Sequence, residues 1–287
     1  MPSLGFRRTC FIKRKEKMSL LETIFVQPLL NGLLVFYHLF ANNLGLSVIG
    51  FTVFIRLALV PLTTPSMRSM HKMRELAPEL SKLKEKHKKD KTRLMQAQAD
   101  FYKKKGVNPM AGCLPQIVQL VILIALFQVF IQMLSGNGEI AQKINRLAYP
   151  PLQVEGVVNT KFVYLDLARP DTIPVEGLPI PLPGPFLIAA ALVQFLSSKM
   201  MAPMVAQQKK KAAKTKGQLD DIMASTQQQM IYLFPLLTLV IGFTFASGLV
   251  LYWFIFSLFQ GVQQYFVSGW GGLTPWVTKI GLVKSNG

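Results

Sequence analysis

The chain has 287 residues, of which 51% are hydrophobic and only 16% charged, and its formal net charge is +18. A soluble domain carries about 25% charged residues. Here Asp, Glu, Lys and Arg are absent from three long stretches, 23–55, 106–138 and 222–278. The last stretch alone is long enough for two membrane crossings of about 20 residues each. The composition therefore excludes a soluble fold and predicts an all-α polytopic membrane protein.

The basic charge and the reactive side chains indicate no chemistry of their own. A basic chain attracts nucleic acid, but in a membrane protein Lys and Arg gather in the cytoplasmic loops, so we expect no specific DNA binding. The cysteines Cys10 and Cys113 and the histidines His38, His71 and His87 are isolated in the sequence and form no metal-ligand pattern. We expect no cofactor, no metal and no enzymatic activity.

The N-terminal part divides into a tail and a helix. Residues 1–22 form a basic tail in which Met18 is a candidate start, since the patterned sequence begins only after it. Residues 23–42 are apolar with polar side chains on one helical face, which favours an amphipathic helix lying in the membrane interface. A full crossing is the alternative, because it would spare the export of the basic tail. The polar face carries Gln27, Asn31 and His38.

A first crossing and a polar hairpin follow. Residues 45–65 form the crossing, and residues 66–108 combine many cations with apolar residues at three–four spacing, which predicts a cytoplasmic helical hairpin. Pro78 should kink the first arm, and Asp90 should cap the second arm after a turn. The apolar positions that mark the hairpin are Met70, Met73, Leu76 and Leu80.

Four more crossings are predicted, over 109–134, 185–203, 229–246 and 248–267, with a hinge at Ser247-Gly248 between the last two. They are separated by an external loop rich in Pro and Gly and by a cytoplasmic basic loop, and a tail ends the chain; these segments are 135–184, 204–228 and 268–287. The hairpin and the basic loop hold 18 cations against four in the external loop. The positive-inside rule therefore places the hairpin and the C-terminus in the cytoplasm.

Arg56 is the one expensive residue in this arrangement, because it lies midway along the first crossing and the five predicted spans contain no Asp or Glu. An arginine at the bilayer centre costs about 2.5–3.5 kcal/mol on insertion scales, so we expect its side chain to face a water-filled cavity. Thr52 and Thr63 share its helical face. A second polar stripe on the last crossing would complete one wet, positively charged groove; its members are Trp253, Ser257, Gln260 and Gln264.

Such a groove favours a binding surface over a proton or cation pathway, which uses Asp, Glu or His relays. It would lower the cost of moving a polar segment part-way across the bilayer while a neighbouring apolar segment slides into lipid. The alternative for the Ser, Thr and Gln residues is ordinary hydrogen bonding between helices.

Three ordered blocks of the sequence resemble the YidC/Oxa/Alb family of membrane protein insertases, over roughly residues 25–267. The blocks are TVFIRLALVPLT followed by SMHKMRELAPEL, then YKKKGVNPMAGCLPQIVQ, then SGLVLYW. The resemblance implies five core transmembrane helices around a hydrophilic groove open to the cytoplasm and the lipid, an amphipathic helix on the outer face and a cytoplasmic hairpin. It also implies a short form in which no large folded domain precedes the core.

The resemblance further implies roles for particular residues. Arg56 would receive the polar segment of the substrate, Thr52 would line the groove and Trp253 would contact the substrate. Met70, Met73 and their hairpin neighbours would meet the substrate first. The chain departs from the family pattern at three positions, which are Ser198, Ala246 and Ser257. Gln194, one turn before Ser198, is a substitute for the polar residue expected there.

Together these features predict an insertase and membrane chaperone that binds nascent hydrophobic segments in the groove and releases them laterally into the bilayer. The expected location is the plasma membrane of a bacterium. The expected partners are nascent membrane proteins, the ribosome, the Sec translocon and the lipid. The alternatives are a membrane channel or transporter and a scaffold for the assembly of membrane complexes.

Overall fold

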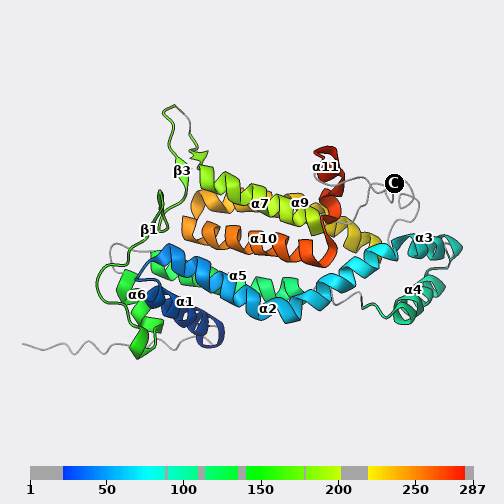
Figure 1. The fold of residues 1–287 in the computed structure, drawn as a ribbon, viewed down its shortest axis with the longest axis horizontal. Coiled ribbons are helices and arrows are strands. Elements are labelled where there is room, and N and C mark those ends of the chain that lie inside the picture. Colours follow the sequence, from blue (N-terminus) through cyan, green and yellow to red (C-terminus); the bar gives the residue numbers. More distant parts are fainter. Residues whose placement is uncertain are drawn as a thin grey trace, which may run out of the picture.

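The computed structural model of the protein describes residues 22–87, 90–108, 114–134, 140–177, 179–201 and 219–281. Within these ranges five long helices run along the long axis of the molecule (Figure 1). They are α2 (Leu44–Glu75), α5 (Leu114–Leu134), α7 (Pro185–Met201), α9 (Leu219–Thr244) and α10 (Ser247–Ser268). Most of the predicted basic tail, both cysteines and most of the predicted 204–228 loop lie outside the described residues.

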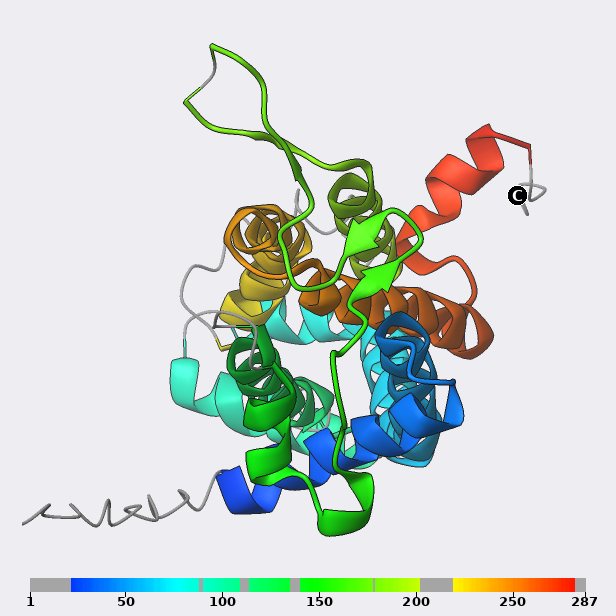
Figure 2. The same ribbon diagram turned by 90° about the vertical axis from the view of Figure 1, so that its left-hand side faces the viewer.

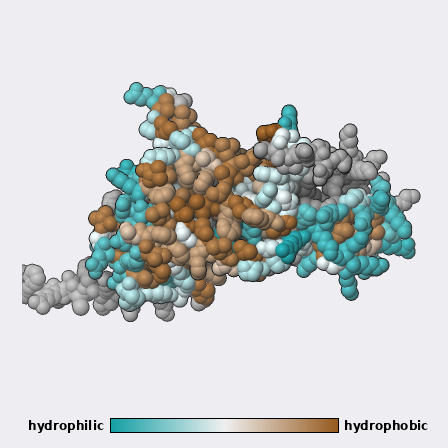
Figure 3. Space-filling model, in the orientation of Figure 1, coloured by the Kyte–Doolittle hydropathy of each residue, from teal (hydrophilic) through white to brown (hydrophobic). Residues whose placement is uncertain are grey.

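An apolar belt covers the middle of this bundle. In Figure 3 hydrophobic residues cover the long helices, and polar residues gather over the hairpin at one end. Within the described ranges one helix, over Leu44–Met73, is by itself long and apolar enough to cross a membrane. Shorter apolar helices cover Gln119–Ile131, Pro185–Met201 and Ile231–Thr244. The chain is thus mostly helical with one clear long apolar span, and the number of five crossings stays a prediction.

The helix α10 lies at the centre of the bundle. It packs against α2 on one side and against α7 on the other, while α7 packs in turn against α9. The helix α5 completes the bundle beside α2 and α10 (Figure 2). The main hydrophobic core lies where α1, α2, α5 and α10 meet, and its buried members include Leu33, Leu34, Phe51, Val129, Leu249 and Tyr252.

The predicted first crossing and the residues after it up to Glu75 form one continuous helix, so the predicted boundary at residue 65 is not the end of a helix. The helix α2 runs on through Pro61 and Pro65 and ends at Glu75. The next helix, α3 (Ala77–Lys86), has Pro78 in its first turn, where the missing N–H would have no helical partner anyway. Pro78 therefore marks a break between two helices instead of a kink within one.

The structure has two short helices, α3 and α4 (Lys91–Lys105), where the hairpin was predicted. Asp90 caps α4 by accepting hydrogen bonds from the backbone N–H groups of Thr92 and Arg93, both at 3.1 Å. Gly106 ends the helix in the left-handed conformation, with φ at 62°. The two arms are joined by an ion pair between Lys105 and Glu79 at 2.7 Å. They share a small core of Leu76, Tyr102 and Val107 with Met73, Leu80 and Phe101 packed against it.

The predicted external loop contains short elements of its own. The helix α6 (Ile140–Leu147) and the 3-10 turn η3 (Pro150–Leu152) come first. Two antiparallel ribbons follow, each with two paired residues per strand. The first joins β1 (Lys161–Phe162) to β2 (Leu165–Asp166), and the second joins β3 (Thr172–Ile173) to β4 (Leu182–Pro183).

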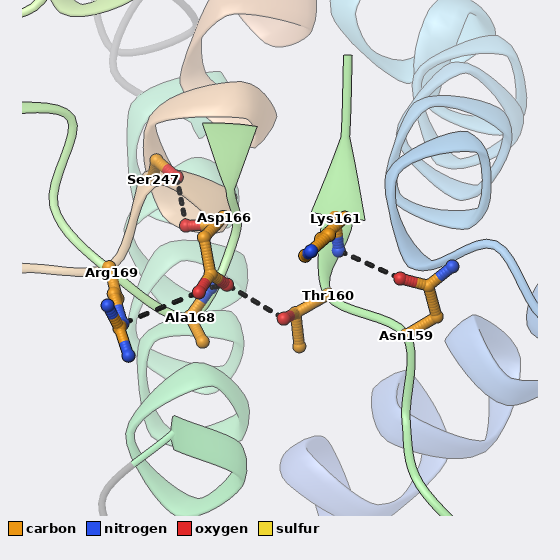
Figure 4. A network of polar contacts seen from close by, with 7 residues as sticks. All are labelled: Asn159, Thr160, Lys161, Asp166, Ala168, Arg169 and Ser247. Atoms are coloured by element: carbon orange, nitrogen blue, oxygen red, sulfur yellow. Dashed lines mark hydrogen bonds and ion pairs between the residues drawn. The ribbon is translucent and has the colours of Figure 1, made fainter. Parts of the chain in front are cut away.

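The first of these ribbons holds the hinge between α9 and α10. The carbonyl oxygens of Leu167 and Arg169 accept the backbone N–H groups of Gly248 and Ser247, at 3.1 and 2.8 Å, and so satisfy donors at the start of α10. The Ser247 hydroxyl donates to the carbonyl oxygen of Asp166 at 2.9 Å. Figure 4 shows this Ser247–Asp166 bond together with the Asp166 carboxylate, which accepts from Thr160. The hinge predicted at Ser247-Gly248 is confirmed.

Asp171 holds the start of α7 in the same way. Its buried carboxylate accepts the backbone N–H of Leu187 at 2.9 Å, and the hydroxyl of Tyr164 accepts the N–H of Phe186 at 2.8 Å. Gly184 is required there, because a Cβ at that position would lie 2.0 Å from the Asp171 carboxylate. The external segment thus fixes the ends of both α7 and α10.

The N-terminal helix α1 (Gln27–Leu39) follows a short π-helix, η1 (Glu22–Val26), and lies crosswise to the bundle at the end that carries the predicted external loop (Figure 2). Of its polar face, Asn31 is covered by protein, Gln27 is half-buried and His38 is exposed. Asn31 is buried, donates to the carbonyl oxygen of Leu147 at 3.0 Å and accepts the backbone N–H of Tyr149 at 2.7 Å. The polar stripe therefore binds the external segment to α1 through Asn31.

The C-terminal part differs from the prediction at two places. The helix α9 begins ten residues before the predicted start at 229, because the polar run after Leu219 continues the helix beyond the apolar part. The predicted tail contains η4 (Gly271–Leu273) and the short helix α11 (Thr274–Lys279). These elements pack on the end of α7 through Met200, Leu273 and Val277. The Nζ atom of Lys199 lies 3.0 Å from the centre of the Trp276 ring.

Candidate functional site

Arg56 lies in the middle of the bundle, between α2 and α10. Its Nη2 donates a hydrogen bond of 3.1 Å to the carbonyl oxygen of Phe256. The guanidinium carbon is 3.7 Å from the centre of the Phe256 ring and 5.5 Å from that of Phe259. A cation over an aromatic face is attracted by the ring quadrupole. The charge is therefore held by a carbonyl and two rings.

The guanidinium is short of acceptors. An arginine side chain carries five N–H donors and no acceptor. Among the described residues Arg56 forms no ion pair, and its buried Nε has no hydrogen-bond acceptor. A buried donor without a partner costs about 1–3 kcal/mol, and more when the group is charged. The side chain can therefore donate further hydrogen bonds, for which the described part of the protein supplies no acceptor.

The expected water-filled cavity around Arg56 is wrong for this structure, because the residue is only 8% exposed. Beside it, one turn earlier, Thr52 lines a hollow of about 10 Å³ together with apolar residues and Tyr252. That volume is near the minimum for one water molecule. The ring of Phe256 lies 3.7 Å from the guanidinium carbon and covers one side of the charge.

Three residues at or near Arg56 were not predicted from the sequence: Gln119, Tyr252 and Phe256. Tyr252 is buried on α10, and its hydroxyl accepts a hydrogen bond of 2.9 Å from Nε2 of Gln119 on α5. The Tyr252 and Phe256 rings lie 6.0 Å apart, so the contact reaches Arg56. The only signal was Gln119 itself, a polar residue in an apolar span. We call Thr52, Arg56, Gln119, Tyr252 and Phe256 the Arg56 site.

Two of the four members of the predicted polar stripe of α10 contact α7 in this structure, and a single groove shared with Arg56 stays a prediction. The carbonyl oxygen of Ser257 accepts the Ser197 hydroxyl at 2.6 Å, and Gln260 donates to the sulfur of Met201, so both face α7. The face toward α2 carries Phe256, Phe259 and Gln263 instead. Successive residues of a helix differ by about 100°, so neighbouring positions on α10 serve different partners.

The remaining candidates are distributed over other contacts. Gln263, which we did not single out, donates to the Thr63 hydroxyl at 2.9 Å and links α10 to α2. Gln194 accepts from Thr238 and links α7 to α9. Gln264 is buried and donates to Ser268 one turn further along the same helix. Trp253 is half-buried against the main core. Most of these polar residues therefore join helices to one another, as the alternative interpretation expected.

The hairpin candidates are also distributed differently from the expectation. Leu76 is buried in the small hairpin core, and Met73 and Leu80 pack against it. Three of the four apolar hairpin residues therefore hold the two arms together, and only Met70 has no place in that core. On the second arm Met95 is 70% exposed.

The helices α5 and α9 meet at one end of the bundle. Phe127 of α5 and Phe245, which follows α9, form an edge-to-face ring pair with centres 4.8 Å apart. Otherwise α9 packs mainly against α7, and α5 against neighbours on the other side of the bundle. The edge between α5 and α9 is thus joined at the end that carries the external segment.

Comparisons with known proteins place the chain among relatives of one kind. The profile of the family described as "60Kd inner membrane protein" matches residues 35–271. The chain is 34% identical to "Membrane protein insertase YidC" of Fusobacterium nucleatum, covering 79% of this chain and 87% of the relative. It is 32% identical to "Membrane protein insertase YidC 2" of Bacillus anthracis, covering 85% and 80%. A longer relative from Chlorobium luteolum, 33% identical, is covered over 34% of its length.

Proposed function

Because the chain belongs to the 60Kd inner membrane protein family, the YidC family of membrane protein insertases, we propose that its Arg56 site receives the polar part of a nascent membrane protein. The protein acts as an insertase in a bacterial membrane and performs no covalent chemistry. The observation that carries the proposal is the buried guanidinium whose Nε finds no acceptor among the described residues.

A polar segment of the substrate supplies the acceptors that Arg56 lacks. A carboxylate or a backbone carbonyl can accept from Nε, and hydrogen bonds to a charged group contribute about 1.5–3 kcal/mol each. The ring of Phe256 lies over the guanidinium in the structure and must turn aside when the segment enters. In this proposal the site stays closed until the ring turns aside.

The apolar segment of the substrate leaves between α5 and α9. The packing of these helices supports this exit. They meet at the ring pair of Phe127 and Phe245, and elsewhere they pack against different neighbours. Transfer of the segment into lipid drives the step, at about 0.8 kcal/mol for each CH₂ removed from water. The ring pair would keep the external end shut while the opposite end admits the chain.

The proposed topology has five crossings, with the hairpin and the C-terminus in the cytoplasm of a bacterial cell and the chain in its inner membrane. The 18 cations of residues 66–105 and 209–216 support it, against four in residues 135–184. The apolar belt between two more polar ends of the bundle supports it as well (Figure 3).

The hairpin is the proposed first contact with the ribosome and the nascent chain. Its exposed cations, among them Lys82, Lys86, Lys103 and Lys104, suit the phosphates of ribosomal RNA. Cooperation with the Sec translocon belongs to the same proposal, since both would handle the same nascent segments.

The test is the insertion of a single-span substrate with an acidic exported tail into liposomes that contain the purified protein. Arg56→Ala should lower the rate roughly tenfold or more, as expected from the loss of about 1.5–3 kcal/mol of charged hydrogen bonding. Arg68→Ala is the matched control, because Arg68 is an exposed cation on the same helix. Equal insertion by the Arg56 variant and the wild type would refute the role of the charge.

A further inference from the structure

The ribbon before α7 is an apolar feature that the insertase mechanism leaves unused. We call residues 172–177 and 179–183 the β3–β4 ribbon. It projects sideways from the external end of the bundle, beyond the start of α7 (Figures 1 and 2). Its base is closed by the pairs Thr172–Pro183 and Ile173–Leu182, and Asp171 directly before it caps α7. The start of α7 therefore fixes where the ribbon lies.

The apolar side chains of the ribbon are not covered by the bundle. Opposite residues of an antiparallel pair point to the same face, so Ile173 and Leu182 form one apolar face. Val175 and Ile180 lie beyond the paired residues, toward the tip of the ribbon, and add two further apolar side chains to it. All four are exposed, and Ile180 most of all at 65%. A contiguous exposed apolar surface indicates a contact with a partner or a membrane.

The composition of the ribbon favours lipid as that partner. Residues 172–183 contain a single charged residue, Glu176, and no Lys or Arg. They also contain four prolines, which have no N–H, so fewer backbone donors lose water when the ribbon enters the membrane interface. The same prolines keep the ribbon from pairing with a strand of another protein. They are Pro174, Pro179, Pro181 and Pro183.

The ribbon also continues the surface that faces lipid in the proposed topology. Ile188, Leu192 and Leu196 of α7 are spaced by four residues and all exposed, so they form an apolar stripe that begins just below the ribbon. We propose that the β3–β4 ribbon lies in the headgroup region of the outer leaflet and anchors the external end of α7 to the lipid. This inference rests on the proposed topology, in which α7 crosses the membrane.

The test uses spin labels at single cysteines, after both native cysteines are replaced by serine. The positions are Ile180→Cys in the ribbon, Leu192→Cys on the lipid-facing side of α7 and Lys161→Cys on the exposed strand β1. The full chain is reconstituted in liposomes, and each label is probed with oxygen, which concentrates in lipid, and with a water-soluble nickel chelate. We expect the label at 180 to shift from the aqueous pattern of 161 toward the pattern of 192.

Two results would overturn the inference. A label at 180 that matches the aqueous label at 161 would place the ribbon in water. A label that is aqueous in liposomes but protected in native membrane vesicles would assign the ribbon to a protein partner. An aqueous label at 192 is a separate failure, because it would contradict the crossing by α7 and the topology on which the ribbon depends.

Discussion

At the scale of single residues, Arg56 combines a buried charge with too few acceptors. Buried charges are costly unless they are paired, and a protein that keeps one without a carboxylate has a use for it. The ring of Phe256 and one carbonyl hold the side chain in place without neutralising it. The residue is therefore the strongest candidate for binding in the described part of the bundle.

Arg56→Lys separates the charge from the shape of the guanidinium. Lysine keeps the positive charge but has no planar fork that can stack on Phe256 and bond two acceptors at once. We expect insertion between that of the wild type and that of Arg56→Ala, measured with the same acidic-tailed substrate. Full activity of the lysine variant would show that charge alone suffices, and activity equal to the alanine variant would show that the fork is essential.

Tyr252→Phe removes the hydroxyl that accepts from Gln119 and leaves this amide without its partner. A buried polar group that loses its partner costs about 1–3 kcal/mol. The variant should unfold at a lower temperature in detergent, as followed by circular dichroism. Tyr265→Phe is the control, because that tyrosine is 45% exposed on the same helix. Equal midpoints for the two variants would argue against a structural role of the Gln119–Tyr252 bond.

Arg56 could be predicted from the sequence, because a charge in an apolar span is visible without coordinates. Its partners could not. A polar stripe predicts which residues share a helical face but not which neighbour that face meets. On α10 the faces toward α2 and α7 differ by one residue, Phe256 against Ser257. Aromatic rings also escape the search for polar residues, although the ring of Phe256 covers one side of the charge.

At the scale of elements, the start of α7 depends on a carboxylate that lies outside the helix. Asp171→Ala should destabilise the protein by about 0.5–2 kcal/mol, the usual cost of losing a cap. Limited proteolysis of the external segment should become faster. Glu176→Ala is the matched control, since Glu176 is an exposed carboxylate in the same segment. Unchanged proteolysis of the Asp171 variant would contradict the capping role.

The hairpin has its own small core and should be separable from the bundle. Replacing residues 78–104 by a short flexible linker should slow the capture of substrate but leave the thermal unfolding of the bundle nearly unchanged. Capture is measured by the binding of ribosome–nascent chain complexes to proteoliposomes. Capture at the wild-type rate by a folded deletion variant would contradict the proposed role of the hairpin.

Element ends were predictable where a residue carries the signal by itself. The cap at Asp90, the stop at Gly106 and the hinge at Ser247-Gly248 follow from their own chemistry. Where composition was the only guide, the helices proved longer, as for α2 beyond residue 65 and α9 before residue 229. Polarity ends a membrane span but not a helix, because polar residues continue a helix in water.

At the scale of the whole molecule, the class of fold and the function could be inferred from apolar stretches, charge distribution and family motifs. Whether the Arg56 site is open or closed could not be inferred from the sequence, because this depends on how the helices rotate against one another. In the proposed mechanism the bundle is closed until an incoming chain replaces Phe256 over Arg56.

A photocrosslinker placed at Phe256 tests this claim most directly, with Leu258 as the control, since Leu258 is an exposed apolar residue on the same helix. Ribosome-bound chains are stalled with their acidic segment entering the membrane. We predict that the probe at 256 crosslinks the acidic segment and that the crosslink is lost in Arg56→Ala, while the probe at 258 does not reach this segment. Efficient insertion without any crosslink from position 256 would contradict the account.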